Sequence, residues 1–527
     1  MLRKVVRWIE ERTGVESAVQ RFLREDIPHS AGWHQVLGSV ALFGFLTQVV
    51  TGILLAFNYA ATPGDAYSSL RYIVTELTAG RMIRGMHHWG ASLMIIVVVL
   101  HMARTFVWGA YKKPREATWI IGCVLLLVTL AYGLTGYLLP WDNRAYWGTV
   151  VTTRIASQAP GAGPYLLRLL GSEGGAIGVV TFSRFYAVHV VLLPPLTILL
   201  MAVHLYLVRR HGVTPTAADH HLPKKTFFPE QVFKDTLATF VWFCVLVGMA
   251  VAARVPLGHI ADPTDASFTP RPEWYFLFLF QALKLFQGPL EIVGSIVLPT
   301  LAILTLFLVP FIDRGKVVRL RQRMGAAAVV VLSAITWGGL TARAVATTPS
   351  VQETDMSLVQ SWQEIPPDEL AAVGYFREGG CESCHPIGRA GAGPDLMVVA
   401  SGKPPAKLLE HFATAKLKPA QMKTLASFFS QRSDKAVEAW ANAPQSAVDG
   451  AMLFDANRCA ECHKLNGAGA DVGPELNGLA ERRPREWVER HFADPAKLSP
   501  DTIMPSFVFN AQDMDRITSY LLQIPKE

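Results

Sequence analysis

The sequence predicts an all-α fold, in which a bundle of seven transmembrane helices is followed by two small helical domains. Of the 527 residues, 51% are hydrophobic and only 17% are charged, which is too apolar for an ordinary soluble enzyme. Seven windows free of Asp, Glu, Lys and Arg approach or exceed the roughly 18 apolar residues that mark a spanning helix. Beyond about residue 345 the chain is more polar and contains an internal repeat, which indicates soluble domains.

The apolar windows define where the chain is expected to cross a membrane. They run at about 32–60, 86–103, 117–141, 185–208, 236–253, 292–312 and 324–342. The shorter apolar run 274–283 is too brief to cross and is expected to pack at the membrane face. Residues 1–28 are charged and lack an apolar core, so we expect the first span itself to direct insertion.

Basic residues predict the orientation of the bundle. Lysines and arginines concentrate in the amino-terminal segment and in the connections between spans two and three, four and five, and six and seven. The positive-inside rule places these segments on the cytoplasmic side of a bacterial inner membrane. Because the number of spans is odd, the carboxyl-terminal domains are expected in the periplasm. The net charge of +7 is therefore a topology signal, and no nucleic-acid partner is expected.

Two Cys-x-x-Cys-His pentapeptides follow the last span. Their cysteines and histidines are Cys381, Cys384 and His385 in the first copy, and Cys459, Cys462 and His463 in the second. In this motif the two thiolates bond covalently to a c-type haem, and the adjoining histidine ligates the iron. Zinc sites or a redox dithiol would not require a histidine directly after the second cysteine in both copies. The sequence thus predicts two covalent c-type haems.

Two of the predicted spans carry paired histidines. His87 and His101 are 14 residues apart, and His189 and His204 are 15 apart, so each pair returns to nearly the same helix face. Fourteen residues of helix rise about 21 Å, close to the hydrocarbon thickness. Two such helices can hold two non-covalent b-type haems, each between two histidines. His88 leaves the choice of the first ligand ambiguous, and a lone histidine in a span would more often be a core or proton-relay residue.

Five segments resemble one known family. They are GRMIRGMHHWGAS at 80–92, YKKPRE at 111–116, GYLLPWD at 136–142, SRFY at 183–186 and PEWY at 272–275. In this order they are similar to cytochrome b of the quinol:cytochrome c oxidoreductases, over about residues 5–345. YKKPRE and the 15-residue histidine spacing resemble the chloroplast-type branch, in which a four-helix chain and a three-helix subunit IV are separate. Here the two look fused.

The resemblance implies roles for the residues of the bundle. His87 and His189 would ligate the outer b haem and His101 and His204 the inner one, with Arg84 and Arg184 placed to meet outer-haem propionates. The haem-facing glycines of the family correspond to Gly38, Gly52, Gly122 and Gly136. A glycine lets a macrocycle lie against the backbone, although small residues also serve plain helix packing.

Two quinone sites are implied in the same way. Pro272, Glu273, Trp274 and Tyr275 match the outer quinol-oxidation site, where a carboxylate in an apolar pocket has the raised proton affinity needed to accept a quinol proton. On the cytoplasmic side, the positions around the quinone-reduction site correspond to Arg209, Lys234 and Asp235.

The chain departs from the family at two points. Val36 stands where the chloroplast-type pattern has a cysteine that attaches an extra haem, so covalent attachment there is not expected. The family's haem c partner is usually a separate chain, whereas two cytochrome c-like domains follow the last span here.

The cytochrome c-like domains form an internal repeat with an offset of 80 residues. Gly393-Pro394-Asp395-Leu396 corresponds to Gly473-Pro474-Glu475-Leu476, and His411-Phe412-Ala413 to His491-Phe492-Ala493. The second copy continues to Met504, which resembles the distal methionine ligand of class I cytochromes c. The first copy lacks about a dozen residues here, so its sixth ligand is expected to be Met397, Met422, a lysine or nothing.

These observations predict five segments. They are a cytochrome b domain (1–215), a subunit IV-like domain (216–345), a tether (346–364), and two cytochrome c-like domains (365–432 and 446–527). As a whole the fold class is a seven-helix transmembrane haem-binding bundle with two small α-helical cytochrome c domains.

The predicted function is that of the membrane core of a cytochrome bc complex. Quinol would be oxidised near Glu273, with one electron passing to a Rieske iron–sulfur partner and the c haems, and the other through the b haems to quinone near Arg209 and Asp235. The chain has no Rieske ligand pair, so that partner must be another chain. A soluble cytochrome c or similar periplasmic acceptor, a homodimer and proton translocation are further expectations. The alternatives are a non-bifurcating haem anchor between quinone and a partner enzyme, and an inert cytochrome scaffold.

Overall fold

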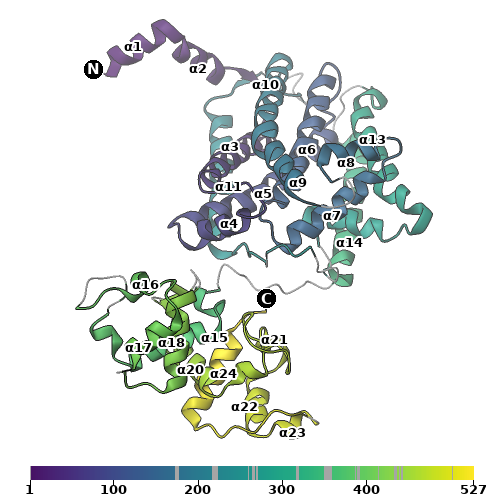
Figure 1. Ribbon diagram of the computed structural model, residues 1–527. Coiled ribbons are helices and arrows are strands. Elements are labelled where there is room, and N and C mark those ends of the chain that lie inside the picture. The colour runs from purple at the N-terminus through teal and green to yellow at the C-terminus, as the bar shows by residue number, and fades with distance from the viewer. Residues whose placement is uncertain are drawn as a thin grey trace. The chain divides into compact units, whose positions relative to one another are not determined.

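The computed structural model describes most of the chain. The described residues are 2–172, 177–215, 223–258, 260–263, 268, 271–315, 320–348, 359–385, 387, 392–413, 415–432, 436–437, 439–440, 443–500 and 502–526. They are mostly helical, which confirms the predicted all-α class. The chain divides into two compact units, Met1–Glu353 and Thr354–Glu527 (Figure 1).

The first unit contains seven helices that are long and apolar enough to cross a membrane, as predicted. They are α3 (Leu37–Ala56), α5 (Gly80–Val107), α6 (Glu116–Tyr137), the continuous helix Val179–His211, α11 (Glu230–Ala252), the helix Val293–Ile312 and α14 (Met324–Thr347). The helix Val179–His211 consists of α9 (Val179–Tyr186), the π-helical segment η3 (Ala187–Leu192) and α10 (Leu193–His211). The helix Val293–Ile312 consists of the π-helical segment η7 (Val293–Val297) and α13 (Leu298–Ile312).

Shorter elements precede the first span or connect the spans. They are α1 (Leu2–Thr13), α2 (Val15–Leu23), α4 (Ala66–Thr75), α7 (Asn143–Ser157), α8 (Gly163–Leu170), α12 (Leu277–Leu283), the 3₁₀ turns η1 (Trp33–Gln35), η5 (Trp274–Phe276), η6 (Gly288–Leu290) and η8 (Leu320–Arg323), and the strands β1 (Asp26–Ile27) and β2 (Lys225–Thr226). The run Trp274–Leu283 is a short apolar helix rather than a span, as expected.

The basic connections lie on one side of the bundle. Strand β1, before the first span, pairs antiparallel with β2, between the fourth and fifth spans. Asp313, after the sixth span, accepts hydrogen bonds from the Tyr111 hydroxyl and from Lys112 Nζ, which lie between the second and third spans, at 2.6 and 2.5 Å. Arg115 in turn donates to the carbonyl of Gly212 at 3.1 Å. These contacts support the predicted topology, while the assignment of this side to the cytoplasm stays a prediction.

The second unit is built from nine α-helices in its described part. They are α15 (Pro367–Glu378), α16 (Leu396–Val399), α17 (Pro405–Phe412), α18 (Pro419–Gln431), α20 (Gln445–Ala456), α21 (Leu479–Arg482), α22 (Arg485–Ala493), α23 (Pro495–Leu498) and α24 (Ala511–Gln523). The 3₁₀ turns η10 (Ser361–Gln363), η11 (Cys381–Ser383) and η12 (Cys459–Glu461) complete it.

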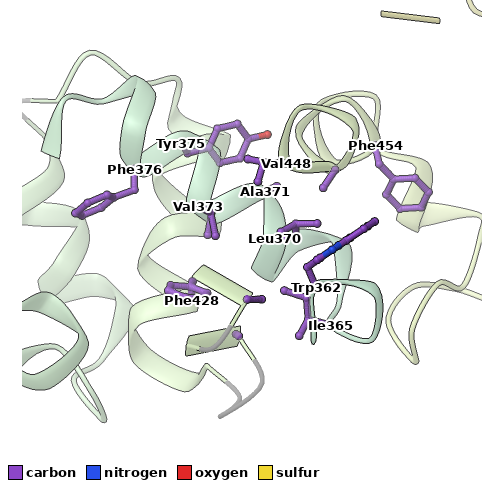
Figure 2. Close-up of a cluster of buried hydrophobic side chains, with 14 of the residues drawn as sticks. Trp362, Ile365, Leu370, Ala371, Val373, Tyr375, Phe376, Phe428, Val448 and Phe454 are labelled. Atoms are coloured by element: carbon purple, nitrogen blue, oxygen red, sulfur yellow. The ribbon is translucent and has the colours of Figure 1, made fainter. Parts of the chain in front are cut away.

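Both repeats contribute to a single hydrophobic core. Leu370 and Phe376 of the first repeat and Val448 and Phe454 of the second belong to the same buried cluster (Figure 2). The hydroxyl of Tyr375, in α15, donates to Asp455 Oδ2, in α20, at 2.8 Å. The packing of α15 against α20 therefore joins the two repeats in one body.

The expected tether and linker contribute to this core where they are described. Trp362, near the end of the predicted tether, is only 2% exposed, and Trp440, between the two repeats, is 7% exposed. Both are large apolar side chains, so their burial follows from the hydrophobic effect. At the other end of the tether, α14 continues to Thr347. Residues 349–358 lie outside the described residues, and the predicted domain boundaries stay predictions.

Candidate functional site: paired histidines and an apolar pocket

The first pair of membrane histidines is His87, on α5, and His189, on η3. Their ring centroids are 6.5 Å apart, and the ring planes meet at 70°. The ring of the neighbouring His88 makes an edge contact with Trp89, at 4.9 Å between centroids. The geometry therefore favours His87 over His88 as the partner of His189.

Two threonines set the protonation state of these rings. Nδ1 of His87 is 2.9 Å from Thr51 Oγ1, and Nδ1 of His189 is 2.9 Å from Thr135 Oγ1. Each hydroxyl donates its own hydrogen to a carbonyl of the preceding turn, at 2.7 Å for Thr51 and 2.8 Å for Thr135. The hydroxyl can then only accept, so Nδ1 must carry the proton and Nε2 is free to bind a metal. Both rings thus fit the axial ligands of a haem.

The second pair is His101 and His204, which lie close enough to interact electrostatically. Each of the four histidines lies against one of the predicted glycines. A Cβ added at Gly52 would lie 3.2 Å from Cε1 of His87, and one at Gly136 only 2.7 Å from Cε1 of His189.

The rings of the second pair, His101 and His204, lie farther from their glycines. Here the corresponding separations are 3.4 Å for Gly38 with His101 and 3.5 Å for Gly122 with His204. The glycines therefore leave space for the histidine rings, and the space is tighter at the His87–His189 level. Such cradles suit haem ligation as well as close helix packing.

A π-helical segment explains the unequal histidine spacing. Ala187–Leu192 surrounds His189 and is followed by Pro194 and Pro195. Proline has no N–H to continue the α-helical hydrogen bonds, and a π turn absorbs one additional residue. The 15 residues between His189 and His204 therefore place the rings much as 14 residues place those of His87 and His101.

The two predicted propionate-binding arginines contact backbone carbonyls. Arg84 is buried and donates to the carbonyls of Val255 and Pro256, at 2.7 and 3.0 Å. Arg184 donates to the carbonyls of Arg168 and Leu169. Their predicted role toward propionates stays a prediction.

The PEWY segment lines an apolar pocket of about 210 Å³. Pro272 and Glu273 face residues of α6 and α7, among them Tyr137 and Thr152. The wall is completed by Gly133, Leu134, Gly148, Val151, Ile155, Phe276, Leu279, Phe280 and Leu283. The pocket therefore forms only because the predicted cytochrome b part and the subunit IV-like part pack together.

Of the four predicted residues, Pro272 and Glu273 line the pocket, whereas Trp274 and Tyr275 pack into the bundle beside it. Trp274 Nε1 donates to Ser92 Oγ on α5 at 3.2 Å, and Tyr275 is 9% exposed and packs over Gly133. These contacts hold the segment in place. Burial raises the pKa of Glu273 above the usual value of glutamic acid, the Arg144 guanidinium opposes this rise, and Asp142 adds to it.

The three residues predicted for the inner quinone site are only partly brought together. Lys234 pairs with Glu230, and Asp235 accepts a hydrogen bond from Gln231 at 2.9 Å. Lys234 Nζ also lies 4.0 Å from the position of a Cβ at Gly32. Arg209 instead pairs with Glu25 at 3.3 Å.

The two Cys-x-x-Cys-His motifs have the same local structure. Each begins after a residue with positive φ, Gly380 at 68° and Arg458 at 59°. In each, Nδ1 of the histidine lies 2.8 Å from a proline carbonyl, Pro394 for His385 and Pro474 for His463. A carbonyl only accepts, so Nδ1 carries the proton and Nε2 is free for a metal.

The cysteines complete both motifs. The thiols of Cys381, Cys384, Cys459 and Cys462 are all unpaired. In the second repeat, Met504 packs partly buried against the shared core. The donor sets therefore fit covalent haem, and Met504 stays the predicted sixth ligand of the second repeat.

Comparisons with known proteins agree with this geometry. Family models match at residues 26–212 (cytochrome b/b6/petB), 260–359 (cytochrome b(C-terminal)/b6/petD) and 447–525 (cytochrome c). The cytochrome bc complex cytochrome b subunit of Chlorobaculum thiosulfatiphilum is 38% identical over 59% of this chain and 74% of the relative. The chain belongs to the cytochrome b family of cytochrome bc complexes.

Further likenesses extend this assignment. Cytochrome b6 of Chlamydomonas reinhardtii is 35% identical over 40% of this chain and 99% of the relative. A solved chain of a hyperthermophilic respiratory Complex III superposes with a TM-score of 0.59 at 28% identity, over 67% of this chain and 94% of that chain. This cytochrome b is thus an integral membrane, haem-binding subunit of electron transport with a cytochrome c domain in the same chain.

Sequence reasoning missed several residues of this cytochrome b. Thr51 and Thr135 were not singled out, although each lies on the same helix as a predicted glycine, at Gly52 and Gly136. Arg104, one turn after His101, is half-buried, and its buried Nε and Nη2 atoms lack a protein hydrogen-bond partner. Such unpaired guanidinium donors suit a propionate of the inner haem.

Proposed function

We propose that this chain is the membrane core of a quinol:cytochrome c oxidoreductase. Four haems would serve it, two b-type between the membrane histidines and two c-type on the Cys-x-x-Cys-His motifs. Haem supplies reversible one-electron chemistry when bound. Quinol would be oxidised in the pocket beside Glu273, with one electron sent toward the c haems and the other toward an inner quinone site.

The observation that carries this proposal is the PEWY pocket. Its wall is almost wholly apolar, which suits a quinone ring and tail, and it contains one carboxylate. A simple electron conduit would use the four membrane histidines equally well, but it has no need of a pocket built between two parts of the chain around a titratable group. The pocket therefore favours quinol oxidation over the alternatives of a non-bifurcating anchor and an inert scaffold.

Glu273 would act as the proton acceptor of the outer site. Its raised pKa suits a group that takes a proton from a quinol hydroxyl as electrons leave. Trp274 and Tyr275 would position it, because both are anchored in the bundle. On the other side, Lys234, Asp235 and Arg209 would bring protons to the quinone being reduced.

The partners and location follow from this function. A Rieske iron–sulfur protein on another chain would take the first electron, and a soluble cytochrome c or similar periplasmic acceptor would take it from the c haems. We propose a homodimeric complex in a bacterial inner membrane, with the amino terminus cytoplasmic, the c haems periplasmic and turnover coupled to proton translocation.

The test is a rapid-mixing experiment on the purified native complex. A pulse of quinol should reduce b and c haems in equal amounts, and an inhibitor of the outer site should block both together. Reduction of b haem without c haem would favour the non-bifurcating anchor. Pyridine haemochrome spectra should give b and c haem in a one-to-one ratio, and any other ratio would contradict the proposed cofactor set.

A further inference from the structure

In the first cytochrome c repeat, the ring of His411 faces that of His385, the proposed proximal haem ligand. The ring centroids of His385 and His411 are 5.8 Å apart, and their planes meet at 77°. The membrane pair His87 and His189 shows nearly the same relation, at 6.5 Å and 70°. His411 thus has the placement of a second axial ligand, whereas the sequence suggested only methionines, a lysine or nothing for this position.

The fold of α17 directs His411 away from the core. Leu408 and Phe412, three residues before it and one after it, are only 7% and 4% exposed and belong to the shared core, and α17 packs on α18. His411 itself is exposed. The helix is therefore anchored by its apolar face, and the imidazole lies outside that face, toward His385.

The connection after α17 cannot supply a methionine. It spans only 413–418, between Phe412 and Pro419, whereas the second repeat has 494–510 between Ala493 and Ala511, with Met504 inside. Of the other two methionines, Met397 is 6% exposed and belongs to the shared core, and Met422 lies within α18 rather than in this connection.

The second repeat offers an internal comparison. His491 occupies the position equivalent to His411, but its ring stacks on Trp487 at 4.5 Å between centroids and 15° between planes. The first repeat has Lys407 at the position of Trp487, and the His411 ring makes only a tilted contact with the adjacent Phe412, at 5.9 Å between centroids. The two equivalent histidines therefore differ in their ring contacts, since His411 contacts His385 and His491 stacks on Trp487.

We propose that His411 is the sixth ligand of the first c-type haem. That haem is then held by two histidines, whereas the second is held by His463 and Met504. The inference rests on the proposed attachment of haem at Cys381 and Cys384. Imidazole ligation lowers the potential of a haem relative to thioether ligation, so electrons run downhill from the first c haem to the second.

Carbon monoxide binding to the reduced, full-length complex tests this assignment. Six-coordinate haems exclude carbon monoxide, so the native protein should bind none at its c haems. A His411→Ala variant should bind one per chain, while the matched His491→Ala variant should bind none. A His411→Met variant should again exclude carbon monoxide and should raise the potential of the first c haem in a redox titration.

Three results would overturn the proposal. The first is carbon monoxide binding to the first c haem of the native protein, and the second is no gain of binding in His411→Ala. The third is a peptide carrying Cys381 and Cys384 without haem in the mass spectrum of the native protein. This last result would show failure of the proposed haem attachment, whereas the first two would leave attachment intact and remove His411 as ligand.

Discussion

Nδ1 of His189 lies 2.9 Å from the hydroxyl oxygen of Thr135, and His87 repeats this contact with Thr51 at 2.9 Å. A histidine whose Nδ1–H is hydrogen-bonded is a more basic ligand and favours ferric iron. We expect Thr135→Val and Thr51→Val each to raise the midpoint potential of the same b haem. The potential should shift by about 59 mV for each tenfold loss in the affinity of the histidine for ferric relative to ferrous iron.

Potentiometric titration of the proposed b haems measures this shift. Thr135→Ser keeps the hydroxyl and serves as the matched control, with the native potential expected. If both valine variants kept the native potential, the threonine hydrogen bond would have no effect on the potential of the haem.

The four glycines beside the histidines should differ in their tolerance of a methyl group. In Gly136→Ala the new Cβ would lie 2.7 Å from the His189 ring, against 3.5 Å from the His204 ring in Gly122→Ala. Overpacking of this kind costs about 1–3 kcal/mol. We expect Gly136→Ala to lose b haem, measured as haemochrome per chain, and Gly122→Ala to retain it. Equal retention of b haem in both variants would contradict the inference that space is tighter at Gly136 than at Gly122.

Glu273 should determine how the rate of quinol oxidation rises with pH on the acid side. Because burial raises its pKa, Glu273 keeps its proton to higher pH than an exposed glutamic acid, and quinol oxidation should rise with pH as this proton is lost. Glu273→Gln should slow turnover by roughly 10²–10⁴-fold and remove that limb, with haem content unchanged. Steady-state rates against pH measure both effects. Unimpaired turnover in this variant would exclude Glu273 from the mechanism.

Met504 should be the sixth ligand of the second c haem. Met504→Ala should abolish the absorption band of ferric methionine–haem ligation near the red edge of the visible spectrum and lower the potential of that haem. Met397→Leu is the control and should leave the band intact, because Met397 contributes to the core. An undiminished band in Met504→Ala would show that another residue ligates this iron.

The membrane part of the fold could be predicted because a bilayer allows few solutions. Backbone groups in lipid must be satisfied within a helix, so charge-free windows of sufficient length identify the spans. The four histidines predicted as haem ligands were identified from the same helical periodicity. The π-helical segment around His189 did not, because a spacing of 15 already returns to nearly the same face, and only Pro194 and Pro195 hint at the extra residue.

Contacts between residues on different helices could not be predicted from the sequence pattern. The hydroxyls of Thr51 and Thr135 look like ordinary residues of an apolar helix until the rings on neighbouring helices are placed. His411 was noticed only as part of a repeat, since its relation to His385 depends on how α17 packs. Trp362 and Trp440 were assigned to connecting segments, because burial in a shared core leaves no periodic signal in so short a stretch.

The shared core of the two repeats has a consequence for biogenesis. Helix α15 precedes the first Cys-x-x-Cys-His motif, yet it packs against α20, which follows the whole first repeat. The first repeat on its own therefore lacks part of its hydrophobic core. We therefore expect both Cys-x-x-Cys-His segments to reach their final fold together, once α20 has been synthesised.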